Sequence, residues 1–172
     1  MSALYRASQL WNALWASPGE GDLHLARQAL SPAQMSLFLQ QHPSEQAHAL
    51  QIYRQLSAQG ANQPDLLTAA LLHDVGKSRY PLRLWERVWI VLGSAWRPDL
   101  VQKWGNAKPA GLQRAFVVRA CHPAWGAEMA AHAGASSLAV ALIRRHQDAI
   151  PEKPLSLEDH LLFQLQTLDD KN

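Results

Sequence analysis

The segment LLTAALLHDVGK runs from Leu66 to Lys77. In it, a mainly apolar run is followed directly by His73 and Asp74. Residues three and four apart share one face of a helix, so His73 continues the stripe of Leu66 and Ala70. Asp74 continues the apolar stripe beside it. An ionised carboxylate on a buried face must be paired or bound to a cation, because isolated burial costs several kcal/mol. The segment therefore predicts a cation partner for Asp74.

Three further polar residues lie on apolar helical stripes. His48 lies one turn before Ile52, and His146 lies one turn after Leu142. Asp169 shares a face with leucines of the preceding two turns. A histidine on an apolar face is usually a satisfied core residue, and an aspartate near a helix end is usually a solvated cap. Each of these residues therefore has an ordinary structural explanation when it is taken alone.

His122 precedes Pro123, and this pair predicts the start of a helix, a position from which a side chain can point into a site. Taken together, the inward histidines and aspartates favour a chemical explanation. Neutral imidazole nitrogens and carboxylates suit divalent transition ions, and an aspartate can bridge two ions. The sequence therefore predicts a cluster of iron, manganese or zinc ions with these ligands: His48, His73, Asp74, His122, His146 and Asp169.

Helices must position these residues, because apolar residues recur at i, i+3 and i+4 along the chain and no Val/Ile/Thr alternation indicates a strand. The fold class that we expect is all-α. Proline, serine and glycine residues predict where the helices begin and end. The expected helices run from Pro32 to about 41, from Pro43 to about 58, from Pro64 to a stop at Gly76, from Pro81 through a Trp-rich stretch, between Pro98 and Pro109, from the pair at 122–123, from about 136 to 147 and from about 156 to 170.

Composition limits the class of protein. A chain of 172 residues that is 48% hydrophobic suits one domain. The net charge of +2 without a basic stretch argues against nucleic acid as a partner. Cys121 is the single cysteine and suits a reducing compartment. The chain starts without a secretion signal, and its most apolar stretch, residues 84–96, is interrupted by Glu86 and Arg87 and is too short for a bilayer of roughly 30 Å. We therefore expect a cytoplasmic protein without membrane contact.

The segment HDVGK at residues 73–77 resembles the signature of the HD-domain superfamily of metal-dependent phosphohydrolases, and it is most similar to the HDIG-type branch. Order and context make this resemblance specific. The other matching segments are QAHALQI at 46–52, HPAWGA at 122–127, IRRHQ at 143–147 and LQTLDD at 165–170. The resemblance covers about residues 37–172 and implies an HD-type helical bundle over 31–172. The Ala- and Leu-rich residues before it predict a separate helical extension over 1–30.

The resemblance also implies a ligand pattern. The basic set of the family falls on His48, His73, Asp74 and Asp169, with Asp74 as the bridge. The additional pair of two-metal members falls on the following residues: His122 and His146. Members that cleave cyclic di-GMP carry a Gly-Tyr-Pro element after paired histidines, whereas here an arginine precedes the second histidine and no such element follows. Cyclic di-GMP is therefore disfavoured as the substrate.

The activity that this pattern implies is hydrolysis of a phosphoester or phosphoanhydride in a small nucleotide-like substrate. Two ions would activate a bridging hydroxide and hold phosphate oxygens, so Asp74 would be catalytic as the bridge. Lys77 emerges one turn after His73 and is expected to be catalytic through contact with phosphate. Arg144 and Arg145 are expected to bind a second phosphate, because guanidinium groups bind phosphate in a bidentate manner.

Two other functions remain open at this point. Some relatives with these ligands hold a di-iron centre and activate dioxygen, and a non-catalytic sensor or scaffold could keep a metal site for stability. The substrate and the native metal are also open. The Trp-rich stretch, residues 84–104, could form a homodimer face because aromatic residues are enriched at interfaces, although buried packing is the commoner use.

Overall fold

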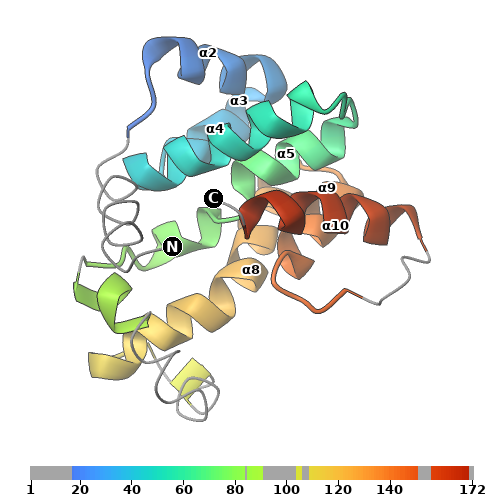
Figure 1. The fold of residues 1–172 in the computed structure, drawn as a ribbon. Helices are drawn as coiled ribbons and strands as arrows, with labels where there is room; N and C mark the ends of the chain where they lie inside the picture. The colour runs from blue at the N-terminus through green and yellow to red at the C-terminus, as the bar shows by residue number, and fades with distance from the viewer. Residues whose placement is uncertain (1–16, 84, 91–103, 106–108, 151–155, 171–172) are drawn as a thin grey trace, which may run out of the picture.

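The computed structural model describes residues 17–83, 85–90, 104–105, 109–150 and 156–170, and all regular structure in these ranges is helical (Figure 1). The expectation of an all-α fold is therefore confirmed. Residues 85–90 form a helical segment. The other elements are α2 Glu20–Ala29, α3 Pro32–Phe38, α4 Pro43–Ala58, α5 Pro64–Leu72, the 3-10 helices η1 Val75–Arg79 and η2 Gly111–Gln113, α8 Arg114–His132, α9 Ser137–Arg145 and α10 Leu157–Asp169.

The helices begin where local chemistry satisfies their first N–H groups. Ser31, Ser136 and Ser156 each accept a hydrogen bond from the backbone N–H three residues later. Proline occupies the first turn of α3, α4 and α5, where its missing N–H costs nothing and its fixed φ favours the helix. Serine caps and first-turn prolines thus explain why these boundaries followed from the sequence.

The core lies between α4, α5, α9 and α10, with α5 in contact with all three of the others. Its largest fully buried side chains include Ile52, Leu66, Leu142 and Leu162. Each such residue contributes about 1.5–3 kcal/mol relative to an exposed side chain. Helix α2 adds Ala26 to the same core and lies at the top of Figure 1. The division into residues 1–30 and 31–172 remains a prediction, and residues 1–16 lie outside the described part.

The expectation that a helix starts at His122 and Pro123 is wrong. Helix α8 is continuous from Arg114 to His132, with the proline inside it. Proline has no N–H, so the carbonyl of Arg119 loses its usual helical donor. The Nδ1–H of His122 donates to that carbonyl over 2.8 Å and also lies 3.1 Å from the carbonyl of Val118. The imidazole therefore satisfies the group that the proline leaves free.

Gly76 also has a different role from the expected helix stop. Helix α5 ends at Leu72, and Gly76 lies inside η1 without a positive φ. A Cβ at this position would lie 2.6 Å from the backbone N of Gly126 and would overlap the carbonyl oxygen of His122. The missing side chain lets η1 touch the backbone of α8, which brings the end of α5 close to His122.

Aromatic residues of the Trp-rich stretch partly pack inward. The ring of Trp89 lies 6.1 Å from that of Phe116, and the ring of Trp104 lies 5.4 Å from it. Trp85 is 48% exposed. Residues 91–103 lie outside the described part, as does most of the expected helix between Pro98 and Pro109, and the homodimer remains a prediction.

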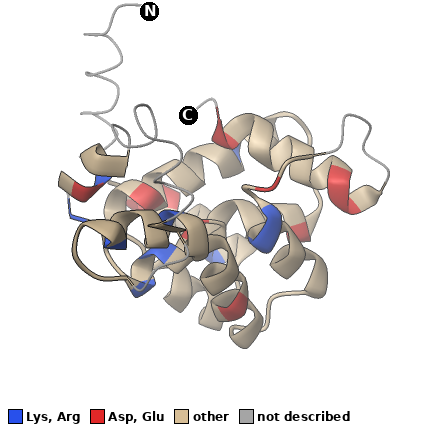
Figure 2. Ribbon diagram, turned by 90° about the horizontal axis from the view of Figure 1, so that it is seen from below, with Lys and Arg blue, Asp and Glu red and all other residues tan. Residues whose placement is uncertain are grey.

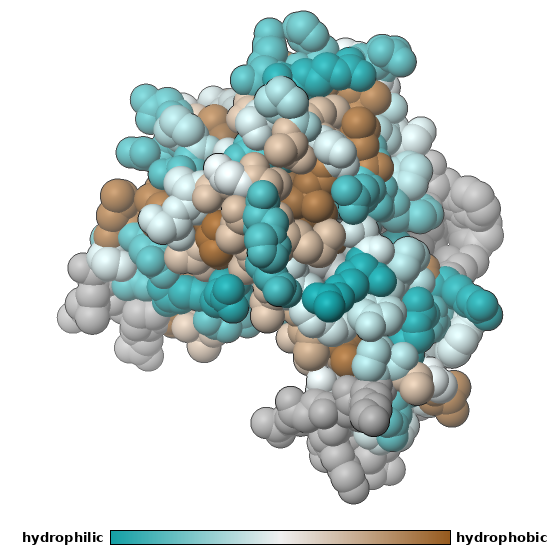
Figure 3. Space-filling view, turned by 180° about the vertical axis from the view of Figure 1, so that it is seen from behind, coloured by the Kyte–Doolittle hydropathy of each residue, from teal (hydrophilic) through white to brown (hydrophobic). Residues whose placement is uncertain are grey.

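The described surface carries mixed charge and small apolar areas. Figure 2 shows acidic and basic residues interspersed along the helices seen from below. Figure 3 shows apolar residues separated by polar ones on the face seen from behind. Within the described ranges, no helix has the length and apolar character needed to span a bilayer.

Candidate metal centre

The structure brings the six predicted metal ligands together from five helices that are far apart in the sequence. They form two groups, and within each group one donor atom per residue lies within 4.8 Å of the others. Both groups have the geometry to hold a metal ion. The first group is His48 on α4, His73 after α5 and Asp169 at the end of α10; the second is Asp74 after α5, His122 in α8 and His146 after α9.

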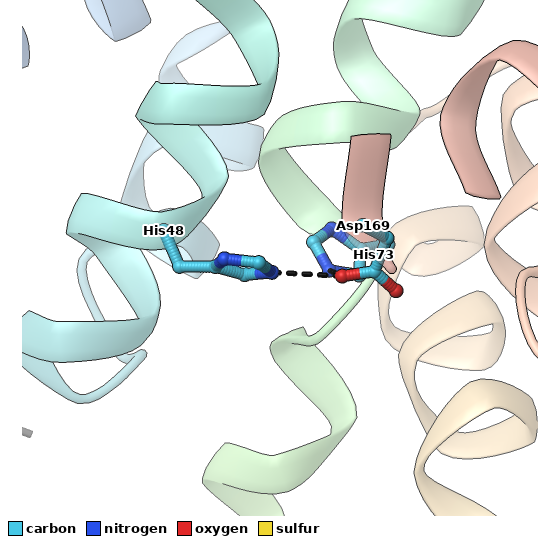
Figure 4. Close-up of side chains that lie close together, drawn as sticks. All are labelled: His48, His73 and Asp169. Carbon is cyan, nitrogen blue, oxygen red and sulfur yellow. Dashed lines mark hydrogen bonds and ion pairs between the residues drawn. The ribbon is translucent and has the colours of Figure 1, made fainter. Parts of the chain in front are cut away.

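The first group is centred on the Asp169 carboxylate (Figure 4). Its Oδ1 lies 2.8 Å from Nε2 of His48 and 3.5 Å from Nε2 of His73. The side chains of His48 and Asp169 are 23% and 24% exposed, whereas that of His73 is fully buried. This group therefore reaches the surface on one side while its third member stays in the core.

The second group is buried and is centred on the Asp74 carboxylate. Oδ1 of Asp74 lies 3.2 Å from Nε2 of His122 and 3.8 Å from Nε2 of His146. The other oxygen, Oδ2, lies 3.5 Å from Nε2 of His73, which belongs to the first group. Asp74 thus faces both groups, one with each oxygen, as a bridging ligand must.

Backbone carbonyls fix the orientation of three imidazoles. In His73, Nδ1 lies 3.0 Å from the carbonyl oxygen of Ala70. In His122, Nδ1 lies 2.8 Å from the carbonyl oxygen of Arg119, and in His146 it lies 2.8 Å from that of Ile143. A carbonyl only accepts, so Nδ1 carries the hydrogen in each ring and Nε2 of the neutral ring keeps its lone pair. This arrangement is usual for metal-binding histidines.

Two observations show that the residues fit a cation. Nε2 of His122 lies 3.1 Å from Nε2 of His146, so two lone pairs face each other when both rings are neutral. Nε2 of His73 is buried without a hydrogen-bond partner. A buried polar atom without a partner is costly, and an ion among these atoms removes the cost. Imidazole nitrogens and carboxylate oxygens together suit divalent transition ions.

Both carboxylates are held in the ionised form that ligation requires. Burial raises the pKa of Asp169, but the hydrogen bond from His48 and the nearby His73 imidazole outweigh burial and hold this pKa well below its usual range. Burial likewise raises the pKa of Asp74, and the charges of Lys77 and His73 outweigh it and lower the pKa well below the usual range. Both groups are therefore anionic at neutral pH.

The buried imidazoles respond in opposite directions. Burial, reinforced by the neighbouring charge of His73, lowers the pKa of His146 to about 3. Burial also lowers the pKa of His73, but the Asp74 and Asp169 carboxylates outweigh it and raise this pKa well above the usual range. His146 is therefore neutral, whereas the two carboxylates favour the protonated form of His73.

A cleft of about 400 Å³ opens beside the two groups, at His48, Asp74, His122 and Asp169. Its wall includes both apolar and basic side chains. The apolar residues are Leu82, Ile90 and Val118, the basic ones are Lys77, Arg87 and Arg119, and the remaining ones are Ser44, Glu45 and Gln147. The site therefore has room for a substrate with an organic part and a charged part.

The expected phosphate-binding residues lie in different places. Nζ of Lys77 lies in the cleft, 2.6 Å from Oδ2 of Asp74. Arg144 is exposed, and Arg145 pairs with Glu158 at 2.5 Å and with Asp159 at 3.0 Å. Neither arginine lines the cleft, so their positions lend no support to the expected role in binding a second phosphate.

Three charged residues of the cleft were missed by reasoning from the sequence: Glu45, Arg87 and Arg119. A signal existed for Glu45, which lies three residues before His48 and so on the same face of α4. In the sequence, Arg87 is only an interruption of the apolar stretch 84–96. Its place in the cleft depends on how residues 85–90 pack, which periodicity alone does not predict.

The model of the HD domain family matches residues 41–169, which is most of the chain. The chain belongs to the HD-domain family. The matched part of this HD domain starts just before α4 and ends at Asp169, so it includes every residue of the two groups. No curated protein and no solved structure matches the chain at a significant level. HD domains are generally metal-dependent hydrolases of small phosphorylated substrates.

Proposed function

We propose that this HD domain hydrolyses a phosphoester or phosphoanhydride bond in a small nucleotide-like substrate, with two divalent transition ions bound. The observation that carries the proposal is the position of Asp74, which faces both ligand groups and, beside Lys77, borders the cleft. The six-ligand pattern of the HDIG-type branch, with the HD-type domain over residues 31–172, forms part of this proposal.

Each ligand group would bind one of the two ions. His48, His73 and Asp169 would hold one ion, and His122 and His146 would hold the other, with Asp74 shared between them. When bound, such ions lower the pKa of a water molecule and neutralise charge on phosphoryl oxygens. The backbone carbonyls behind His73, His122 and His146 would keep the Nε2 of each ring available to an ion.

Side chains of the cleft act on the substrate directly. The Lys77 ammonium can donate a hydrogen bond to a phosphoryl oxygen and stabilise the charge that develops there. Arg87 and Arg119 add positive charge to the cleft, while Leu82 and Val118 offer apolar surface to the organic part of the substrate. These residues orient the phosphate toward Asp74 and reduce the access of bulk water.

The test combines metal analysis with a substrate screen. Purified full-length protein is analysed for iron, manganese and zinc, stripped with chelator and reloaded with each metal in turn. It is then assayed against dinucleoside polyphosphates, cyclic dinucleotides and nucleoside phosphates, with and without oxygen. We expect metal-dependent release of phosphate or nucleotide that does not require oxygen.

Other outcomes would replace this proposal. Oxygen consumption with bound iron, and no cleavage of phosphorylated compounds, would assign the chain to the di-iron oxygenases. Metal binding without turnover of either kind would support a sensor or scaffold. A protein that binds no divalent ion after reloading would contradict all three metal-based functions.

A further inference from the structure

A chain of alternating charges leads away from the metal centre. Nζ of Lys77 lies 2.6 Å from Oδ2 of Asp74 and 3.3 Å from Oε2 of Glu45. Oε1 of Glu45 lies 2.8 Å from Nη1 of Arg87. All four residues line the cleft, and all four also line an adjoining cavity of about 230 Å³. The charge chain therefore forms the wall between the two spaces.

Lys77 is shared between two carboxylates with different roles. Asp74 belongs to the metal centre, whereas Glu45 belongs to neither ligand group. A divalent ion at Asp74 repels the nearby ammonium and neutralises the carboxylate that held it. Glu45 then becomes the stronger anionic partner of Lys77.

Glu45 is well placed to hold the ammonium. Its side chain is 12% exposed, and each of its carboxylate oxygens already contacts a different cation. Arg87 binds Oε1, which leaves Oε2 directed at Lys77. Because Glu45 lies outside both ligand groups and contacts Lys77, it acts on the site through Lys77.

We propose that Glu45 is a positioning residue that holds the Lys77 ammonium in the cleft while metal occupies Asp74. This inference rests on the proposed function. The contact with Glu45 reduces the repulsion between ammonium and metal, and it keeps the ammonium where a phosphoryl oxygen binds. Glu45 therefore raises metal affinity and phosphate affinity together, in both cases through Lys77.

The experiment is a double-mutant cycle on metal affinity, measured by calorimetry with Mn²⁺ on chelator-stripped full-length protein. Glu45→Gln should weaken binding about 3- to 10-fold, since one partly screened charge pair is changed. Lys77→Met should tighten binding by a similar factor because it removes the repelling charge. In the Lys77→Met background, Glu45→Gln should change the affinity less than about twofold.

A kinetic readout complements the binding data once a substrate has been found. Lys77→Met should lower kcat/KM about 10- to 1,000-fold, the usual effect of losing a charge-stabilising contact. Glu45→Gln should mainly raise KM, and Glu45→Asp should recover part of the loss. Glu128→Gln is the matched control, because Glu128 is exposed and pairs with Arg79 outside the cleft.

The outcomes separate this inference from the proposed function. If the parent protein binds no Mn²⁺, the metal centre itself is wrong. If the parent binds Mn²⁺ and Glu45→Gln weakens binding equally with and without Lys77, Glu45 acts directly on the metal and the positioning role is wrong. Should Glu45→Gln fail to fold, Lys77→Met decides: tighter Mn²⁺ binding supports the inference, and unchanged or weaker binding overturns it.

Discussion

The two ligand groups differ in how well the protein alone satisfies them. In the first group, Asp169 and His48 form a 2.8 Å hydrogen bond at a partly exposed position. In the second group, Nε2 of His122 and Nε2 of His146 face each other at 3.1 Å in a buried position. Two facing acceptors are unfavourable, whereas an imidazole and a carboxylate are complementary.

This difference indicates where a metal ion contributes most to stability. An ion in the first group gives Nε2 of His73 a partner but replaces the hydrogen bond that His48 and Asp169 already make. An ion in the second group removes the conflict between His122 and His146. We therefore expect the second group to couple metal binding to folding more strongly than the first.

The largest effect is expected from removing the residue that faces both groups. Asp74→Ala should lower kcat/KM at least about 1,000-fold, because it would remove the carboxylate that faces both ligand groups and would leave Lys77 without its nearest anion. The measurement is hydrolysis of the best substrate at saturating Mn²⁺, together with the metal stoichiometry. Asp170→Ala is the control, since Asp170 is exposed and belongs to neither group.

A variant of Asp74 that keeps both the parental rate and two bound ions would show that the groups do not share this carboxylate. A variant that loses one ion and keeps the other would identify which group depends on it.

The second prediction concerns the close contact between Gly76 in η1 and the backbone of α8, which brings Asp74 near His122 in the second ligand group. Gly76→Ala places a methyl group against the backbone of α8 at Gly126 and His122, so it should destabilise the fold by about 3 kcal/mol or more. Thermal unfolding measures the loss. Gly21→Ala is the control, because its Cβ would meet nothing within 4 Å and alanine favours a helix by about 0.5–1 kcal/mol. Equal melting temperatures for the two variants would contradict the close approach.

Melting temperatures measured with and without Mn²⁺ compare the two ligand groups directly. Mn²⁺ at about 100 times its Kd should stabilise the parent by about 2.7 kcal/mol and raise Tm by roughly 5–10 °C. His122→Leu should lose most of this rise, yet in chelator it should melt higher than His48→Leu, because losing the facing acceptors offsets the lost hydrogen bond to the carbonyl of Arg119. His48→Leu should melt lower in chelator, since Asp169 loses its hydrogen bond. The reverse order in chelator would show that the first group is the unsatisfied one.

The smallest effect is expected at a buried carboxylate outside both groups. Glu86 lies 2.5 Å from Arg114 and accepts a 2.7 Å hydrogen bond from the backbone N–H of Arg83. Burial raises the pKa of Glu86, but these partners outweigh it and lower the pKa below 4.5. The unfolded chain then takes up this proton more readily than the folded one, so the stabilisation is present above pH 4.5 and is lost as pH falls.

Glu86→Gln should therefore cost about 1.5–3 kcal/mol at pH 7 and less at pH 4. Thermal unfolding at both pH values measures the difference between parent and variant. A difference that grows as pH falls would contradict the lowered pKa of Glu86.

Periodicity predicted most of the fold and the inward direction of five candidate ligands. These residues lie on apolar stripes, and burying such a stripe turns the polar residue on it inward. They are His48, His73, Asp74, His146 and Asp169. The capping serines and first-turn prolines predicted the helix starts for an equally local reason. These features depend on short segments, which is why a single sequence contains them.

The features that the sequence did not predict depend on contacts between segments. Pro123 ordinarily suggests a helix start, but packing of α8 against η1 and α9 keeps the helix continuous. Gly76 looks like a helix stop until the backbone of α8 is placed beside it. Glu45 and Arg87 look like surface charges until their helices meet at the cleft. Local propensity carries no information about these neighbours.

The distance along the chain between His48 and Asp169 has a consequence for biosynthesis. The two residues are 121 positions apart, and their hydrogen bond joins α4 to the end of α10. A ribosome must therefore translate α10 and release it from the exit tunnel before the first ligand group can close. The second group lacks this constraint, because its last member, His146, is made earlier. A nascent chain can thus bring the members of the second group together before those of the first.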